Sequence, residues 1–181
     1  MSPAARSRLK LAALLLVAIV IQTTFASDLR VDRVAPDLMI LVAVCAGLEG
    51  GAGTGAVVGF LAGLLADLSL TATPMGLSSL AFCLTGWAVG HLRSTLLPEG
   101  RLVQPLIGMV ATAGGLLVYV MAAGLSGQTV VTSLGVHWLL RVVVVESLWN
   151  AVLVIPTAAL MDWALRGSGD RLARAEPLAG R

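Results

Sequence analysis

The sequence predicts an all-α integral membrane protein with about six transmembrane helices and both termini in the cytoplasm. Three observations support this prediction: the composition, a series of apolar segments, and the placement of the arginines and lysines. Of the 181 residues, 57% are hydrophobic and 12% are charged, whereas a typical soluble domain carries about 25% charged residues. The mean hydropathy is +0.93. So few charges cannot cover a surface exposed to water, and this excludes a soluble domain.

Six apolar segments are candidate membrane spans, because a bilayer core requires about 20 apolar residues in a helix. They are 9–25, 35–48, 52–68, 76–92, 102–125 and 138–165. The first follows a basic stretch, as in a cleaved signal peptide, but the rest of the chain is equally hydrophobic, so we interpret it as a retained helix. We therefore expect a single six-helix membrane domain over residues 1–165 and a disordered cytoplasmic tail over residues 166–181.

The positions of arginine and lysine set the orientation, because positive charges accumulate on the cytoplasmic side. With six spans and the amino terminus inside, three basic residues fall outside: Arg30, Arg33 and Arg141. Nine fall inside: Arg6, Arg8, Lys10, Arg93, Arg101, Arg166, Arg171, Arg174 and Arg181. An odd number of spans would put the C-terminal arginines outside. The charges therefore favour six spans with both termini in the cytoplasm.

The second and third spans are nearly continuous in hydropathy, but the sequence EGG at 49–51 offers a tight turn between them. We expect a helical hairpin there. Glycines then recur at every fourth position, at Gly55, Gly59 and Gly63. Positions four apart lie along one ridge of a helix, and glycines there leave a groove that lets a neighbouring backbone approach closely. The groove is a candidate interface, either within the chain or with a partner protein.

Two acidic residues lie at the outer ends of spans. Asp37 follows Pro36 in the first turn of the second span, where a carboxylate suits the helix dipole and proline suits the first helical position. Asp67 ends the third span, where the dipole disfavours a negative charge, so it requires a partner or water. Since Arg141 lies at the same outer level, we predict an Asp67–Arg141 ion pair. The alternative for Arg141 is to extend to the outer interface.

The last span also carries Glu146 and, four residues later on the same face, Asn150. A charge at the centre of a bilayer costs roughly 3 kcal/mol or more, so such residues face protein or water rather than lipid. We therefore expect an intramembrane polar face of Arg141, Glu146 and Asn150, turned into the bundle. Whether this face holds a ligand stays open at this point.

Motifs for catalysis or cofactor binding are weak or absent. GLSG at 124–127 matches the GxSG pattern of intramembrane serine proteases, with His137 nearby, but Ser126 falls at a helix end or in an outer loop, whereas such a nucleophile requires a sheltered site. The sequence has no HExxH, no histidine cluster for a metal and no phosphate-binding GxxxxGKS/T loop. Cys45 and Cys83 are interpreted as packing residues. We predict that the protein is not an enzyme and that it binds no cofactor, metal or nucleic acid.

Four stretches, in this order, resemble the bacterial rod shape-determining protein MreD. They are APDLMILVAV after the first span, GFLAGLLADL at the end of the third, TPMGLSSLAFCLTGWAVGHL as the fourth and WNAVLVIP in the last. The resemblance covers residues 36–156. The matching positions are Pro36, Asp37, Leu38, Gly59, Phe60, Gly63, Asp67, Gly76, Gly86, Gly90, Asn150 and Pro156.

The resemblance implies a multi-pass protein of the bacterial cytoplasmic (inner) membrane and of the cell-elongation machinery. In that family, MreD associates with MreC, a single-span protein with a large extracytoplasmic domain. The assembly links the MreB filament to the wall synthases RodA and a class B penicillin-binding protein. The family fold is similar to that of the substrate-binding membrane subunits, or S components, of energy-coupling-factor vitamin transporters.

We therefore expect a non-catalytic scaffold that binds MreC and helps to organise peptidoglycan synthesis and cell shape. The expected partner interface comprises the glycine groove and the outer acids: Gly55, Gly59, Gly63, Asp67, Pro36 and Asp37. The alternative is a substrate-binding membrane subunit of an energy-coupling-factor-type vitamin transporter, with Glu146 and Asn150 lining a pocket in the membrane. A role in handling lipids is a further alternative, because an inward polar face could also hold a headgroup.

Overall fold

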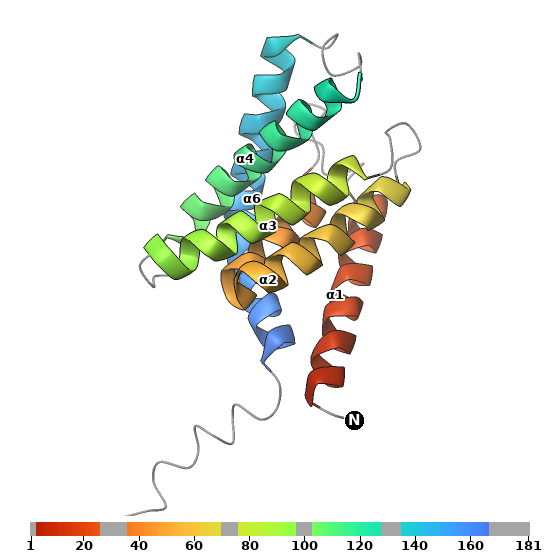
Figure 1. The fold of residues 1–181 in the computed structure, drawn as a ribbon, viewed down its shortest axis with the longest axis vertical. Coiled ribbons are helices and arrows are strands. Elements are labelled where there is room, and N and C mark those ends of the chain that lie inside the picture. The colour runs from red at the N-terminus through yellow and green to blue at the C-terminus, as the bar shows by residue number, and fades with distance from the viewer. Residues whose placement is uncertain (1–2, 26–35, 70–75, 97–102, 128–134, 167–181) are drawn as a thin grey trace, which may run out of the picture.

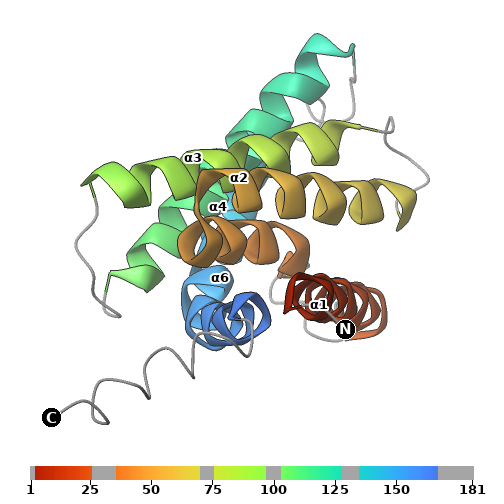
Figure 2. The ribbon, with the colours of Figure 1, turned by 60° about the horizontal axis from the view of Figure 1, so that its bottom comes forward.

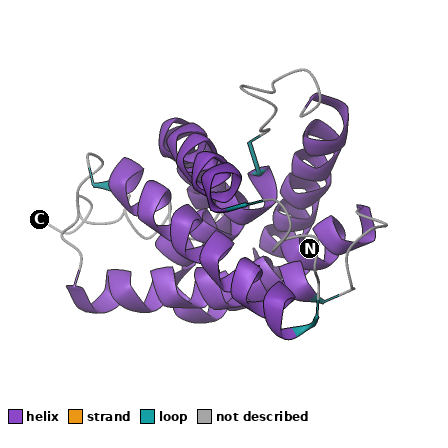
Figure 3. Ribbon diagram, turned by 90° about the horizontal axis from the view of Figure 1, so that it is seen from above, coloured by secondary structure: helices purple, strands orange, loops and turns teal. Residues whose placement is uncertain are grey.

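The computed structural model describes residues 3–25, 36–69, 76–96, 103–127 and 135–166. Helices account for nearly all of these residues, and no strand occurs among them (Figure 3). In chain order the helices are α1 (Pro3–Phe25), α2 (Leu38–Ser69), α3 (Leu77–Leu96), α4 (Gln104–Leu125) and α6 (Val136–Leu165) (Figure 1). The predicted all-α class is confirmed. The predicted tail, apart from Arg166, lies outside the described residues.

Four of these helices, α1, α2, α4 and α6, are long and apolar enough to cross a membrane. The predicted fourth span, α3, has 20 residues but is not one of these four helices, because polar residues such as His91 and Arg93 lower its mean hydropathy. By length and apolarity, four of the described helices are candidate spans, with the α2 hairpin described next counted as one.

α2 is interrupted at Gly51, which has φ 78° and ψ −179°, outside the helical region. Glycine adopts a positive φ without the steric cost that a side chain imposes. The chain turns back at this point (Figure 2), and Gly55 after the turn comes into contact with Gly47 before it. The turn predicted at 49–51 is therefore present, and the two halves of α2 form a helical hairpin.

The first half of the α2 hairpin lies at the centre of the molecule. Every residue from Met39 to Leu48 is buried, and a helix that is apolar all round belongs in an interior. It touches α3 through Gly47, α4 through Ile40 and α6 through Cys45. The other helices of the chain therefore surround this segment.

The beginning of α1 lies beside the end of α6. The Ser7 hydroxyl donates a hydrogen bond to the Leu165 carbonyl at 3.3 Å, and the Lys10 ammonium donates one to the Trp163 carbonyl at 3.2 Å. Lys10 also lies 4.3 Å from the centre of the Trp163 ring, in a cation–π contact. These contacts bring the start of the first helix and the end of the last to the same end of the molecule (Figure 1).

Candidate functional site

The glycine groove of α2 is filled by α3 of the same chain, which runs alongside it in Figure 2. A Cβ atom added at Gly55, Gly59 or Gly63 would overlap, respectively, the backbone of Gly86, Phe82 and Ser78. The two helices therefore pack backbone against backbone, as small residues allow. Of the two possibilities for the groove, internal packing is the one that the structure contains, and these three glycines offer no free surface to a partner helix.

Asp67 is buried, with 2% exposure, and it binds the beginning of α3 rather than Arg141. Its carboxylate accepts hydrogen bonds from the backbone N–H groups of Gly76 (2.8 Å), Ser78 (3.1 Å) and Ser79 (3.2 Å), and from the Ser79 hydroxyl (2.9 Å). These N–H groups belong to the first turn of α3, where a negative charge is favourable. The predicted Asp67–Arg141 ion pair is wrong, because α3 already supplies the donors that the carboxylate requires.

The opposite end of the α2–α3 pair is joined by a salt bridge. Arg93 Nη1 on α3 lies 3.4 Å from Glu49 Oε2, beside the turn of α2. Gln104 Nε2, at the start of α4, donates a hydrogen bond to Glu49 Oε1 at 3.4 Å. Glu49 thus connects the α2 turn to two other helices, with an exposed fraction of its side chain of 13%.

The beginning of α2 is tied to α1 and α6. Asp37 Oδ1 accepts hydrogen bonds from the backbone N–H groups of Met39 (2.8 Å) and Ile40 (3.3 Å), so Asp37 caps the helix, as its position in the sequence predicts. The N–H of Leu38 donates to Gln22 Oε1 on α1 at 2.8 Å. Pro36 is buried and Asp37 is half-buried, so these two residues belong largely to the interior.

A buried polar cluster lies where α4 and α6 meet the start of α2. Asn150, fully buried on α6, donates from Nδ2 to the Asp37 carbonyl at 3.3 Å and to Thr112 Oγ1 on α4 at 3.1 Å. Glu146 and Ser147 lie one turn earlier on α6 and are 5% and 4% exposed. Asp37, Thr112, Glu146, Ser147 and Asn150 are called the polar cluster below.

The expected polar face of α6 is therefore divided by the structure. Glu146 and Asn150 point into the bundle, whereas Arg141 is exposed. Sequence reasoning missed Thr112 and Ser147. Both are short polar side chains within apolar runs, and Ser147 lies three residues before Asn150, a spacing that places them on one helical face.

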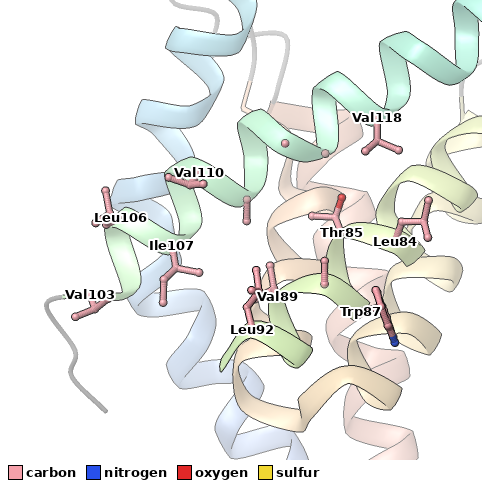
Figure 4. A pocket seen from close by; sticks show the side chains of 14 residues that line it. Leu84, Thr85, Trp87, Val89, Leu92, Val103, Leu106, Ile107, Val110 and Val118 are labelled. Atoms are coloured by element: carbon pink, nitrogen blue, oxygen red, sulfur yellow. The ribbon is translucent and has the colours of Figure 1, made fainter. Parts of the chain in front are cut away.

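A groove with a volume of about 560 Å³ lies between α3 and α4. Figure 4 shows its apolar lining, with Trp87 and Leu92 on α3 and Leu106 and Val110 on α4. Its lining also includes small residues, among them Gly114, whose Cβ position has no atom within 4 Å. We call this the α3–α4 groove. An apolar surface of this kind suits hydrocarbon, either the side chains of a helix or the acyl chain of a lipid.

The serine of the GLSG stretch is not arranged as a nucleophile. The Ser126 hydroxyl is exposed and donates a hydrogen bond to the carbonyl of Ala122 in its own helix, at 2.8 Å. Among the described residues, no group of three or more His, Cys, Asp or Glu side chains could hold a metal ion.

The model of the rod shape-determining protein MreD matches residues 7–163, which include most of every helix described above. The chain belongs to the MreD family. Neither a curated protein nor a solved structure matches it. As a member of the MreD family it has a role in determining rod shape, and its four long apolar helices are of the kind that cross membranes.

Proposed function

We propose that this MreD-family protein is a non-catalytic scaffold of the cell-elongation machinery in the bacterial cytoplasmic membrane. It would bind MreC and thereby help to organise peptidoglycan synthesis and cell shape. The match to the MreD model over residues 7–163 carries this proposal. It also favours the scaffold over the vitamin-transporter alternative. RodA, a class B penicillin-binding protein and, where the cell has one, the MreB filament are the proposed further members of the assembly.

We propose six spans with both termini in the cytoplasm: α1, the two halves of α2, α3, α4 and α6. The contact between the start of α1 and the end of α6 supports an even number of crossings. The lower apolarity of α3 does not oppose a span, because Ser78, Ser79 and Thr85 are buried, with 3%, 2% and 6% exposure. These polar groups face protein rather than lipid. We propose that the resulting arrangement is similar to that of transporter S components.

We place the transmembrane helix of MreC in the α3–α4 groove. The glycine face of α2 is occupied by α3, and the carboxylate of Asp67 is engaged at the start of α3. The α3–α4 groove, in contrast, is lined by side chains of only two helices and has room at Gly114. Helices associate in lipid mainly through close packing at small residues, which this groove provides. A single-span partner presents one helix, which matches a single groove.

Crosslinking in native membranes, followed by tagged purification and mass spectrometry, tests the function itself. Recovery of MreC together with RodA or a class B penicillin-binding protein is the expected result. Recovery of a transporter's ATPases and coupling subunit, without MreC, would overturn the scaffold proposal.

The location of the partner is tested by two matched substitutions. Gly114→Leu fills the α3–α4 groove and should lower the recovery of MreC by about tenfold, which corresponds to about 1.4 kcal/mol. Gly53→Leu is the control, because Gly53 lies elsewhere on α2 and likewise has no atom within 4 Å of its Cβ position. Equal recovery of MreC with the two variants would exclude the α3–α4 groove as the binding surface and leave the scaffold function standing.

A further inference from the structure

Three oxygen-bearing side chains at the centre of the polar cluster have incomplete hydrogen bonding. The Ser147 hydroxyl and Asn150 Oδ1 are buried and have no hydrogen-bond partner among the residues that the structure describes. The Glu146 carboxylate, 5% exposed, forms no hydrogen bond or ion pair with the described part of the chain. A buried polar atom without a partner is costly, by about 1–3 kcal/mol for each neutral group and more for a charged one. Three such groups together indicate a missing ligand.

The Asn150 amide is held in place and lies on the same side of α6 as the other two groups. Its Nδ2 is held by the Asp37 carbonyl and by Thr112, so the orientation of the planar amide is fixed. Side chains on a helix lean toward its N-terminus, and Glu146 and Ser147 lie four and three residues before Asn150 on α6. The Asn150 side chain therefore leans toward the turn that carries Glu146 and Ser147.

The charged groups of the polar cluster are both acidic, namely Asp37 and Glu146. Asp37 acts electrostatically on Glu146, but the Asp37 carboxylate is itself stabilised by the N–H groups at the start of α2. The helices that meet at the polar cluster also carry Tyr119 on α4 and Arg141 on α6. Arg141 is exposed and lies five residues before Glu146, about 140° away around the helix. The polar cluster itself therefore contains no positively charged side chain that could pair with Glu146.

We propose that Glu146, Ser147 and Asn150 form a binding site for one Na⁺ ion, with Asp37 adjacent to it. A carboxylate, an amide oxygen and a hydroxyl oxygen are the ligands that hard cations prefer. When Glu146 is ionised, a single positive charge balances its carboxylate, because the N–H groups at the start of α2 already stabilise Asp37. This favours a monovalent ion over a divalent one. One ion would also satisfy all three oxygens, which do not hydrogen-bond to one another. This site is independent of the proposed partner surface, because the α3–α4 groove contains none of these residues.

The direct test measures the purified full-length protein in NaCl, KCl and choline chloride at constant ionic strength. Thermal unfolding followed by tryptophan fluorescence should shift to higher temperature with increasing NaCl and then saturate, because a ligand that binds only the folded state stabilises it. Choline chloride should give no such shift. A wild-type protein whose unfolding temperature is the same in NaCl and choline chloride would overturn the proposal, and an equal response to KCl would overturn the choice of Na⁺.

Two substitutions locate the ion. Glu146→Gln should abolish the saturable response to NaCl, whereas the control Glu49→Gln, at the α2 turn, should keep it. If Glu146→Gln fails to fold, Ser147→Ala removes a single oxygen at little steric cost. It should raise the half-saturating NaCl concentration about tenfold, the scale expected for losing one bond to a charged group. An unchanged NaCl response in folded Glu146→Gln, or in Ser147→Ala, would place the ion elsewhere and overturn the assignment.

Discussion

The carboxylate of Asp67 accepts hydrogen bonds from both the backbone N–H and the hydroxyl group of Ser79, at 3.2 and 2.9 Å. This contact joins the last turn of α2 to the first turn of α3. Taken within α2 alone, an acid at the C-terminal end is unfavourable. It is favourable here because the same carboxylate lies at the N-terminal end of α3 and satisfies N–H groups that have no partner within that helix.

Replacement of this carboxylate should destabilise the protein. Asp67→Ala removes four hydrogen bonds from the start of α3, and we expect a loss of about 2 kcal/mol in the free energy of unfolding, at the upper end for a helix cap. The control is Asp162→Ala, whose ion pair with Arg166 is partly exposed and is worth about 0.5 kcal/mol. Thermal unfolding in detergent measures the loss of stability in each of the two variants. Equal losses would contradict a capping role for Asp67.

Because α2 packs so closely on α3, adding a single methyl group between them should strongly lower the stability of the protein. In Gly59→Ala the new Cβ atom would overlap the backbone of Phe82, so the helices must separate, and we expect a destabilisation of about 2 kcal/mol. The matched control, Gly53→Ala, adds the same methyl group where no atom lies within 4 Å. It should leave stability unchanged or raise it by up to about 1 kcal/mol. Chemical denaturation in mild detergent measures both; a neutral Gly59→Ala would mean that the helices are not in backbone contact.

The hydrogen bond from Asn150 to Thr112 predicts that replacing Thr112 costs more stability than replacing another buried threonine, Thr85. Thr112→Val removes the acceptor for Asn150 Nδ2 and should cost about 1 kcal/mol, as hydrogen bonds between membrane helices do. Thr85→Val is the control, because the Thr85 hydroxyl donates only to the Ala81 carbonyl of its own helix. The unfolding midpoint of Thr112→Val should therefore be lower than that of Thr85→Val. A lower midpoint for Thr85→Val than for Thr112→Val would show that the Asn150–Thr112 hydrogen bond contributes nothing to stability.

The contact between the ends of α1 and α6 predicts a crosslink. In a variant without Cys45 and Cys83, cysteines at Ser7 and Arg166 should be joined by a short bis-maleimide, because the Ser7 hydroxyl already reaches the neighbouring Leu165 carbonyl at 3.3 Å. A membrane-impermeant maleimide should label both cysteines in inside-out vesicles and neither in intact cells. Labelling of the two cysteines from opposite sides would rule out an even number of spans.

The parts of the fold that the sequence predicts correctly depend on local signals. Long apolar runs predict α1, α4 and α6. Gly50 and Gly51 predict the turn, because the positive φ at Gly51 favours glycine. Asp37 is predicted as a helix-start residue because its carboxylate caps the helix that follows directly. In each case the residues that interact are close in the sequence, so the pattern itself contains the information.

The incorrect predictions concern which elements lie side by side. The spacing of Gly55, Gly59 and Gly63 indicates a close approach of some backbone, but spacing does not identify α3 as its source. The cap of α3 comes from Asp67, nine to twelve residues before its donors, which is too far for a capping pattern to reveal. The shared outer level of the two residues suggested Arg141 as the partner for Asp67. Backbone N–H groups satisfied the carboxylate instead, and they carry no signal in the sequence.

The first half of the α2 hairpin has a consequence for how the protein is made. From Leu38 to the break at Gly51 it has about 13 residues, or roughly 20 Å of helix, whereas the hydrocarbon core is about 30 Å thick. As one of the proposed spans it is shorter than the hydrocarbon core, so it depends on contacts with protein neighbours. These neighbours include α4 and α6, which the ribosome synthesises later. The segment therefore reaches a stable place only when the last helix has entered the membrane. A chain truncated after α3 should be a substrate for membrane proteases, so that only complete chains accumulate.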